Sequence, residues 1–284
     1  MILWYNLIVK DAFLLSGISN KVIHYVGGYM YKIINGDCLD VMKEKIPSNF
    51  VDLTITSPPY DNLRTYNGYN FDFEGIANEL YRVTKDGGVV VWVVGDATIN
   101  GSESGTSFKQ ALYFKEIGFN LHDTMIYAKN NPIPLNHNRY EQQFEYMFVF
   151  SKGKPKTFNP IKIPTIGAGK KYSWKDTNDY GDKSAKRARN ETSIVKKDKI
   201  DYNIWFMNVS KSKYTNSAPF PEELAERHIV SWSNEADMVF DPFVGSGTTG
   251  KMAVLNNRKF IGIDISKEYC EMSKERIENS LNNK

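Results

Sequence analysis

A glycine-rich turn near the carboxyl end of the chain constrains the fold more than any other feature. Asp241-Pro242-Phe243-Val244-Gly245-Ser246-Gly247-Thr248-Thr249-Gly250 lies between an apolar stretch, Met238-Val239-Phe240, and a helical pattern. A further predicted strand, Phe260 to Ile265, places Asp264 nineteen residues after Gly245, which is typical of a nucleotide-binding turn and its acidic partner. Only twenty residues follow Asp264, too few to complete such a sheet. The missing strands must therefore come from the amino-terminal half.

That half has the alternation of strands and helices that such a sheet needs. Strands are predicted over 31–34, 51–55, 89–94, 121–128 and 144–150, and helices over 38–46, 74–84 (closed by Asp86-Gly87-Gly88) and 106–117. Asn35-Gly36-Asp37 would end the third strand of the sheet and Thr56 to Tyr60 the fourth, with the first and second coming last in the chain. We therefore predict an α/β fold, a circularly permuted Rossmann-like domain with a mostly parallel sheet and helices on both faces.

Positive charge is concentrated in one segment. The net charge is +3, yet residues 151–200 hold fourteen Lys or Arg against five Asp or Glu, so the rest of the chain is net negative. Proline and glycine break any period there, which predicts an insertion, 151–203, between a catalytic half, 30–150, and a cofactor-binding half, 204–284. A charge run alone is more typical of a solvated lysine-rich loop, and the aromatic residues interleaved with the cations shift the interpretation toward a nucleic-acid partner.

Composition excludes several classes of protein. Apolar residues make up 41% of the chain, but the longest apolar run, Val89 to Val94, is far too short to span a membrane. No signal peptide is evident, and residues 1–29 read as a loosely packed extension. Two cysteines and four scattered histidines provide neither a disulfide framework nor a metal site, and His228 falls on an apolar helix face where packing is expected. We expect a soluble cytoplasmic protein.

Ser57-Pro58-Pro59-Tyr60 follows a predicted apolar strand, at the sheet edge where ligands bind in such folds. The prolines stiffen the turn and leave carbonyl groups pointing outward. The Ser57 hydroxyl and the Pro58 carbonyl could accept both N–H groups of an exocyclic base amine, which frees the nitrogen lone pair for attack on a methyl group. Tyr60 could stack on the base, which must first be flipped out of the duplex. We therefore predict that Ser57, Pro58, Pro59 and Tyr60 form the catalytic turn.

Five motifs in this order resemble the β-group DNA amino-methyltransferases, which use S-adenosylmethionine. They are Asn35-Gly36-Asp37-Cys38, Thr56 to Tyr60, Ser217-Ala218-Pro219-Phe220-Pro221-Glu222, Asp241 to Thr249, and Phe260 to Asp264, and the match covers about residues 31–150 and 204–280. The chain departs from many members at Asn216, where they carry His. The resemblance implies a methyltransferase fold with a target-recognition region between its halves, where the basic segment lies.

The resemblance also implies where the ligands bind. S-adenosylmethionine would contact Asp241, Phe243, Gly245 and Gly247, with Asp264 on the ribose and Asp37 near the adenine. We add their motif neighbours to the expected cofactor site: Cys38, Ser217, Pro219, Phe220, Ser246, Thr248 and Ile265. Double-stranded DNA would contact the basic segment, at Lys170, Lys171, Lys175, Lys183, Lys186, Arg187 and Arg189. No residue pattern decides for or against a homodimer or a partner restriction endonuclease.

The methylated base and the reaction class leave alternatives open. Members of this group with Ser in the first catalytic position tend to modify cytosine N4, so Ser57 favours cytosine over adenine N6. Cytosine C5 methylation needs a cysteine nucleophile in a Pro-Cys loop, a setting that neither Cys38 nor Cys270 has. A nicotinamide-dependent dehydrogenase would explain the glycine turn but not Ser57 to Tyr60. A non-catalytic nucleic-acid-binding module and an RNA substrate are the remaining alternatives.

Overall fold

The computed structural model describes residues 24–26, 29–59, 71–132, 138–173, 192–210 and 219–282. The chain divides into two compact units, which we describe separately. The main unit comprises Met1–Asn159 and Asn203–Lys284, and the inserted unit comprises Pro160–Tyr202. Residues 151–159 and 203 of the basic segment thus belong to the main unit.

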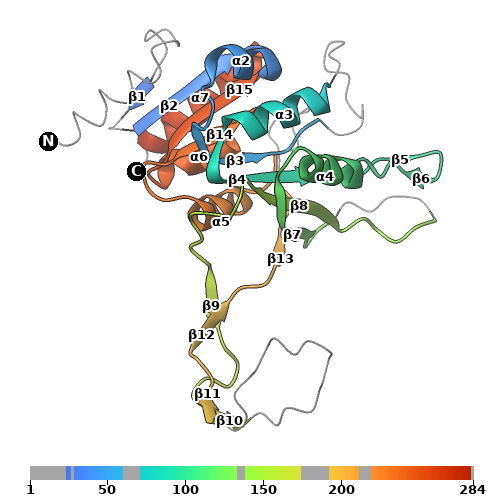
Figure 1. The fold of residues 1–284 in the computed structure, drawn as a ribbon, viewed down its shortest axis with the longest axis vertical. Coiled ribbons are helices and arrows are strands. Elements are labelled where there is room, and N and C mark those ends of the chain that lie inside the picture. The colour runs from blue at the N-terminus through green and yellow to red at the C-terminus, as the bar shows by residue number, and fades with distance from the viewer. Residues whose placement is uncertain are drawn as a thin grey trace, which may run out of the picture. The chain divides into compact units, whose positions relative to one another are not determined.

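The main unit is built on one nine-stranded sheet (Figure 1). Its strands, in their order across the sheet, are β1 (His24–Val26), β2 (Tyr29–Asn35), β15 (Lys259–Asp264), β14 (Met238–Asp241), β3 (Val51–Thr56), β4 (Thr84–Val94), β8 (Phe144–Ser151), β7 (Asn120–Lys129) and β13 (Ile204–Met207). Strands β2, β15, β14, β3 and β4 run parallel to one another, and β8 is antiparallel to both of its neighbours. The sheet is therefore mostly parallel.

The last two strands of the chain lie inside the sheet, between strands from the amino-terminal half. β15 pairs with β2 from Phe260↔Tyr31 to Asp264↔Asn35, and β14 pairs with β3 at Phe240↔Thr54. This order confirms the circularly permuted Rossmann-like fold. It also explains the unbroken run of apolar residues from Val89 to Val94. All six side chains are buried, because this strand is covered on both faces of the sheet.

Helices cover both faces of the sheet (Figure 1). Helices α2 (Cys38–Lys45), α3 (Phe73–Val83) and α4 (Thr106–Glu116) pack side by side on one face, and α5 (Glu222–Trp232), α6 (Thr248–Leu255) and α7 (Lys267–Asn282) pack on the other. The first layer and the strands enclose a continuous core, which includes Trp92 of β4, Phe114 of α4 and Phe150 of β8. A small hairpin, β5 (Thr98–Ile99) and β6 (Ser102–Glu103), precedes α4.

The structure differs from the sequence prediction where α3 meets β4. Asp86-Gly87-Gly88 does not close the helix, which ends at Val83 and passes directly into the strand. The pairing of β3 with β4 shifts from Val51↔Thr84 to Leu53↔Val89. The residues between Thr84 and Val89, which include Asp86-Gly87-Gly88, therefore form a bulge within β4. Gly87 has φ +81°, a conformation that favours glycine, and its N–H donates to the Lys152 carbonyl.

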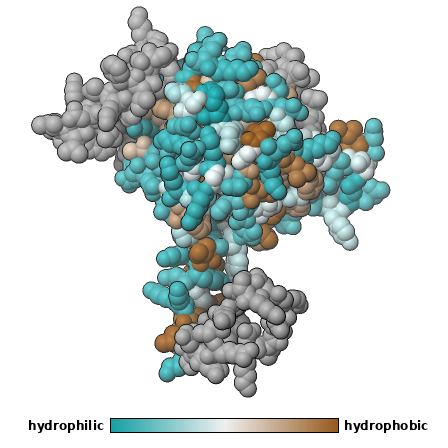
Figure 2. All heavy atoms as spheres, in the orientation of Figure 1, coloured by the Kyte–Doolittle hydropathy of each residue, from teal (hydrophilic) through white to brown (hydrophobic). Residues whose placement is uncertain are grey.

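The amino-terminal stretch 1–29 contributes to the sheet. His24–Val26 forms β1, an edge strand that pairs antiparallel with the start of β2. Residues 1–23 lie outside the described residues. No helix in the described ranges is long and apolar enough to cross a bilayer, and the face of the main unit in Figure 2 is mainly hydrophilic with smaller hydrophobic areas.

In its described residues, 160–173 and 192–202, the inserted unit contains short paired strands. β9 (Lys162–Pro164) pairs antiparallel with β12 (Asp198–Ile200), and β10 (Lys171–Ser173) pairs antiparallel with β11 (Thr192–Ile194). Turns at Gly167 and Gly169, both with φ near +80°, lie between β9 and β10. The unit thus has local order that its sequence, which lacks any period, does not predict.

Candidate functional site

Four of the predicted site segments come together at one edge of the sheet. Because β2, β15, β14 and β3 are parallel neighbours, their carboxyl ends lie at the same edge. Asp37 follows β2, Asp264 ends β15, the glycine turn follows β14, and Ser57 follows β3. Segments far apart in the chain thus form one candidate site.

A buried carboxylate connects the catalytic strand to the glycine turn. Asp241, 2% exposed, accepts hydrogen bonds from the Thr56 hydroxyl at 2.7 Å and the Phe243 N–H at 3.0 Å on Oδ1, and from the Thr249 hydroxyl at 2.7 Å on Oδ2. Thr56 directly precedes Ser57, and Phe243 and Thr249 flank the glycines. These three bonds therefore hold the Ser57 turn and the glycine turn in a fixed relation.

The electrostatics of Asp241 follow from its burial. Burial raises the pKa of Asp241 to about 6, although the two threonine hydroxyls and the Phe243 N–H lower it, and the charge of Asp264 raises it further. At neutral pH the side chain is therefore mainly an anion, which accepts all three bonds. Since both oxygens are engaged by the protein, we interpret Asp241 as a residue that positions the site.

The glycines of the turn differ in what surrounds them. Gly245 (φ +49°) and Gly247 (φ +83°) both have backbone conformations that favour glycine. A Cβ on Gly247 would lie 2.6 Å from Ser273 Oγ, and one on Gly250 would lie 2.5 Å from a ring carbon of Phe260. Among the described residues, a Cβ on Gly245 would meet the Phe243 carbonyl oxygen, at 3.8 Å, and no other heavy atom within 4 Å. Only Gly245 of the three thus leaves open space in which a ligand can approach the backbone.

Asp264 is held in place at the next strand end. Its Oδ2 accepts the Gly245 N–H at 3.0 Å and its Oδ1 accepts the Ser266 N–H at 2.8 Å. Burial raises the pKa of Asp264, and these two N–H groups oppose the shift. Each carboxylate oxygen has a further lone pair, so the group can still accept bonds from ligand hydroxyls.

Sequence reasoning missed the contribution of Asn35. Its side-chain N–H group donates to the backbone carbonyls of Asp264 at 3.0 Å and Ile265 at 2.9 Å, which fixes the end of β15. Ile265 is 49% exposed and so presents an apolar surface beside Asp264. The amide side chain at the end of β2 is a weak signal by itself, because its partners lie about 230 residues away in sequence.

Asp37 and Cys38 have roles in forming α2. Asp37 Oδ1 caps the helix by accepting the Leu39 N–H at 2.8 Å and the Asp40 N–H at 3.1 Å. Asp37 Oδ2 accepts no hydrogen bond within the described residues and remains suited to a ligand. The Cys38 side chain is buried in the core, so a cofactor could contact that residue only through its backbone.

The catalytic turn is described as far as Pro59. Ser57 and Pro59 are half-buried and Pro58 is buried, directly after β3. Phe243 packs against Phe71, with ring centroids 5.8 Å apart, and Phe71 was not singled out in the sequence. Its position after a polar loop gave no signal of this contact.

The remaining predicted residues fall into two groups. Pro219 and Phe220 are half-buried just before α5, the hydroxyl groups of Ser246 and Thr248 contact Arg276, and Lys170 and Lys171 are exposed in the inserted unit. Seven others lie outside the described residues: Tyr60, Lys175, Lys183, Lys186, Arg187, Arg189 and Ser217.

His228 packs in the core, as its helix face indicates. It is fully buried, its Nε2 lies 3.4 Å from Met147 Sδ, and its ring centroid lies 4.7 Å from that of Trp205. Burial lowers the pKa of His228 to about 3, so the ring is neutral. Within the described ranges, no group of three His, Cys, Asp or Glu side chains is placed to hold a metal ion.

Comparison with known proteins identifies a consistent set of relatives. A protein-family model described as DNA methylase matches residues 51–275. The orphan methyltransferase M.BamHII of Bacillus amyloliquefaciens is 55% identical over 253 residues, which cover 84% of this chain and 93% of the relative. The DNA adenine methyltransferase YhdJ of Escherichia coli (strain K12) is 30% identical over 261 residues, which cover 87% and 82%.

Solved structures give the same result for the fold. The M1.HpyAVI–SAM complex is 25% identical with a TM-score of 0.59, and the match covers 87% of this chain and 99% of that one. The PvuII DNA methyltransferase (cytosine-N4-specific) is 20% identical with a TM-score of 0.64, over 89% and 90% of the two chains. The second match supports the α/β fold alone.

Proposed function

The chain belongs to the DNA methylase family, and on that premise we propose that it transfers a methyl group from S-adenosylmethionine to cytosine N4 in double-stranded DNA. One observation carries the proposal. The Asp241 bridge joins the turn that would receive the base to the turn that would receive the methyl donor. Such fixed juxtaposition is what a transfer between two bound ligands requires.

The residues present fit S-adenosylmethionine. Gly245 leaves the open space that a cofactor needs for close backbone approach, Asp264 can accept from ribose hydroxyls, and Ile265 presents an apolar surface suited to an adenine ring. The M1.HpyAVI–SAM complex, from a relative in structure and sequence, supports the same cofactor. When bound, S-adenosylmethionine supplies an electrophilic methyl group on a positively charged sulfur.

The Ser57 turn would prepare the base. The Ser57 hydroxyl and the Pro58 carbonyl accept hydrogen bonds from the two N–H groups of the amine, which draws its nitrogen toward tetrahedral geometry and frees the lone pair. Pro58 and Pro59 restrict the backbone, so these acceptors are fixed before the base arrives. In this proposal Tyr60 stacks on the flipped base.

Cytosine N4 is favoured by Ser57, whose neutral hydroxyl stands where adenine-modifying members of the group tend to carry Asp. Adenine N6 is the second candidate, and one observation favours it. YhdJ, described as a DNA adenine methyltransferase, is 30% identical to this chain over most of its length. Both amines have two N–H groups, so either could be polarised by the same two acceptors.

We propose further that the inserted unit recognises the DNA target. Lys170 and Lys171 are exposed there, and the surrounding segment 151–200 carries the excess positive charge of the chain. Because the substrate is DNA, we place the protein in the cytoplasm. We leave the homodimer and the restriction endonuclease outside the proposal.

Nucleoside mass spectrometry tests the proposed reaction. We expect DNA incubated with the protein and methyl-labelled S-adenosylmethionine to yield labelled N4-methylcytosine after digestion. Labelled N6-methyladenine would select the second candidate. Tight binding of NAD without binding of S-adenosylmethionine would contradict both candidates.

Replacing the serine tests its assigned role. We expect Ser57→Ala to lower turnover about a hundredfold or more, because one acceptor of the amine is removed, while the dissociation constant for S-adenosylmethionine stays near the wild-type value. Thr54→Val on the same strand is the matched control. It removes a buried hydroxyl that has no partner within the described residues, so its turnover should be unchanged. Normal turnover of Ser57→Ala would remove Ser57 from the mechanism.

A further inference from the structure

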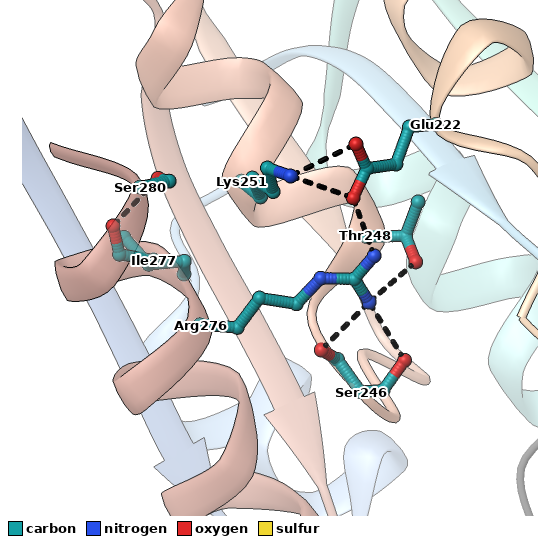
Figure 3. A network of polar contacts seen from close by, with 7 residues as sticks. All are labelled: Glu222, Ser246, Thr248, Lys251, Arg276, Ile277 and Ser280. Carbon is teal, nitrogen blue, oxygen red and sulfur yellow. Dashed lines mark hydrogen bonds and ion pairs between the residues drawn. The ribbon is translucent and has the colours of Figure 1, made fainter. Parts of the chain in front are cut away.

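An arginine from α7, Arg276, points toward the glycine turn (Figure 3). One terminal nitrogen of Arg276 donates to the Ser246 carbonyl at 3.2 Å, the Ser246 hydroxyl at 3.0 Å and the Thr248 hydroxyl at 3.1 Å. Ser246 lies between the two glycines with positive φ, and Thr248 is the first residue of α6. The guanidinium thus contacts both sides of Gly247.

Glu222 holds this arginine in place. The second terminal nitrogen of Arg276 donates to Glu222 Oε1 at 2.7 Å, and the Lys251 ammonium donates to both carboxylate oxygens at 2.7 and 2.8 Å. Burial by itself raises the pKa of Glu222, but the hydrogen bonds and charges of Lys251 and Arg276 outweigh it and lower the pKa. Glu222 begins α5 and Lys251 lies on α6, so the network joins three helices to the turn.

The electrostatics show why the acid is needed. Gly247 is the N-cap of α6 and has no side chain that could accept a hydrogen bond from the first turn. The positive end of the helix dipole is therefore not compensated by a capping side chain. A guanidinium at such a position is unfavourable unless an anion lies beside it. Glu222 is that anion, and it is the last residue of the motif Ser217 to Glu222, in which Ser217, Pro219 and Phe220 are expected to contact the cofactor.

We propose that Arg276, held by Glu222, is a positioning residue that sets the backbone of Ser246–Thr248 for binding of S-adenosylmethionine. This rests on the proposed function and extends it to a residue that the motifs do not contain. The side chains of Arg276 and Glu222 are 29% and 39% exposed, and ion pairs of this exposure contribute little to folding. Their effect is therefore expected in the shape of the turn, with the fold retained.

Calorimetric titration of S-adenosylmethionine into purified variants tests this. We expect Arg276→Gln to raise the dissociation constant about tenfold or more, with kcat at saturating cofactor and DNA within about twofold of the wild type. Glu222→Gln should weaken binding in the same direction but less. Lys274→Gln is the matched control, because Lys274 lies on the same helix and pairs with Glu271, at 2.9 Å, rather than with the turn. It should bind as the wild type does.

The outcomes separate this inference from the proposed function. A wild-type protein that does not bind S-adenosylmethionine would overturn the proposed function itself. Wild-type binding together with unchanged affinity of Arg276→Gln would overturn only the positioning role. If Arg276→Gln does not fold, Arg276→Lys decides, because its single ammonium keeps the charge but cannot bridge Glu222 and the turn with two separate nitrogens. We expect intermediate affinity, and full affinity would contradict the proposal.

Discussion

Asp241 shows how one residue connects binding to stability. Its pKa is raised from 3.8 to about 6, so the folded protein binds a proton more tightly there than the unfolded chain does. The resulting stabilisation is complete below pH 3.8 and is lost as pH rises to about 6. We expect the free energy of unfolding of the wild type, relative to Asp241→Asn, to fall by about 2–3 kcal/mol over this range.

Urea unfolding at several pH values measures this difference, and Asp237→Asn serves as a comparison for a less buried acid. If the difference in unfolding free energy between the wild type and Asp241→Asn does not vary between about pH 4 and 6, the burial of Asp241 does not raise its pKa. Because the amide introduced by Asp241→Asn would present an N–H group to one of the two threonine hydroxyls, we also expect this variant to bind S-adenosylmethionine more weakly.

Two glycines of the turn should respond differently to alanine. From the sequence, one expects a side chain on Gly247 to block the cofactor, but the structure gives another reason for this glycine, since a Cβ there would meet Ser273 of the protein itself. We expect Gly247→Ala to lower the free energy of unfolding by about 2–4 kcal/mol. Gly245→Ala should cost about 1–2 kcal/mol, from its positive φ alone, yet abolish most cofactor binding.

Thermal unfolding with and without S-adenosylmethionine distinguishes the two variants. Gly245→Ala should unfold near the wild-type temperature but show little stabilisation by the cofactor. Equal loss of stability in both variants would contradict the assignment of open space to Gly245.

At the scale of elements, local sequence pattern predicted the permuted order of the two halves of the sheet, but it did not predict the strands β1 and β13. Apolar runs such as Val89 to Val94 and the position of Asp264 near the chain end require strands from both halves, and the permuted order follows from that requirement. The α3–β4 junction was not predictable, because Gly87 and Gly88 are equally typical of a helix end and of a bulge. The strands of the inserted unit lack a period because they are only three residues long.

The contacts that form the site were beyond sequence reasoning for a different reason. Thr56 and Asp241 are separated by 185 residues, and Arg276 reaches Ser246 from another helix across 30 residues. Such partners are determined by the packing of whole elements, and no local spacing encodes them. The motifs therefore predicted which segments meet, but not the hydrogen bonds of the Asn35 side chain, the contact of Arg276 or the bridging role of Asp241.

One arginine between two helices allows a test at the same scale. Arg82 of α3 donates to the Met42 carbonyl at 2.7 Å, which also accepts the Ile46 N–H, and to the Ile46 carbonyl at 3.0 Å just after α2. We expect Arg82→Ala to lower the free energy of unfolding by about 1–3 kcal/mol in urea, and Arg82→Lys to lower it less. Cofactor affinity should not change, and a change in affinity without loss of stability would show that α2 affects the site by another route.

At the scale of the whole molecule, the excess positive charge lies in one segment of the chain and the excess negative charge in the rest. Residues 151–200 carry an excess of nine positive charges while the remainder is net negative. A nonspecific polyanion site spread over the molecule would make every lysine about equally important. A DNA site on the inserted unit would instead make the salt dependence of binding sensitive to the lysines of that unit.

The slope of log affinity for DNA against log salt concentration distinguishes these cases. We expect the double variant Lys170→Gln/Lys171→Gln to reduce the magnitude of this slope by about 1–2. For each lysine that no longer neutralises a phosphate, about one counterion fewer is released from the DNA on binding. Lys109→Gln, on α4 of the main unit, is the control and should leave the slope unchanged. Cofactor affinity should be normal in both variants, since neither one replaces a residue of the expected cofactor site. Equal slopes for the double variant and the wild type would place the DNA contacts elsewhere and remove Lys170 and Lys171 from the recognition surface.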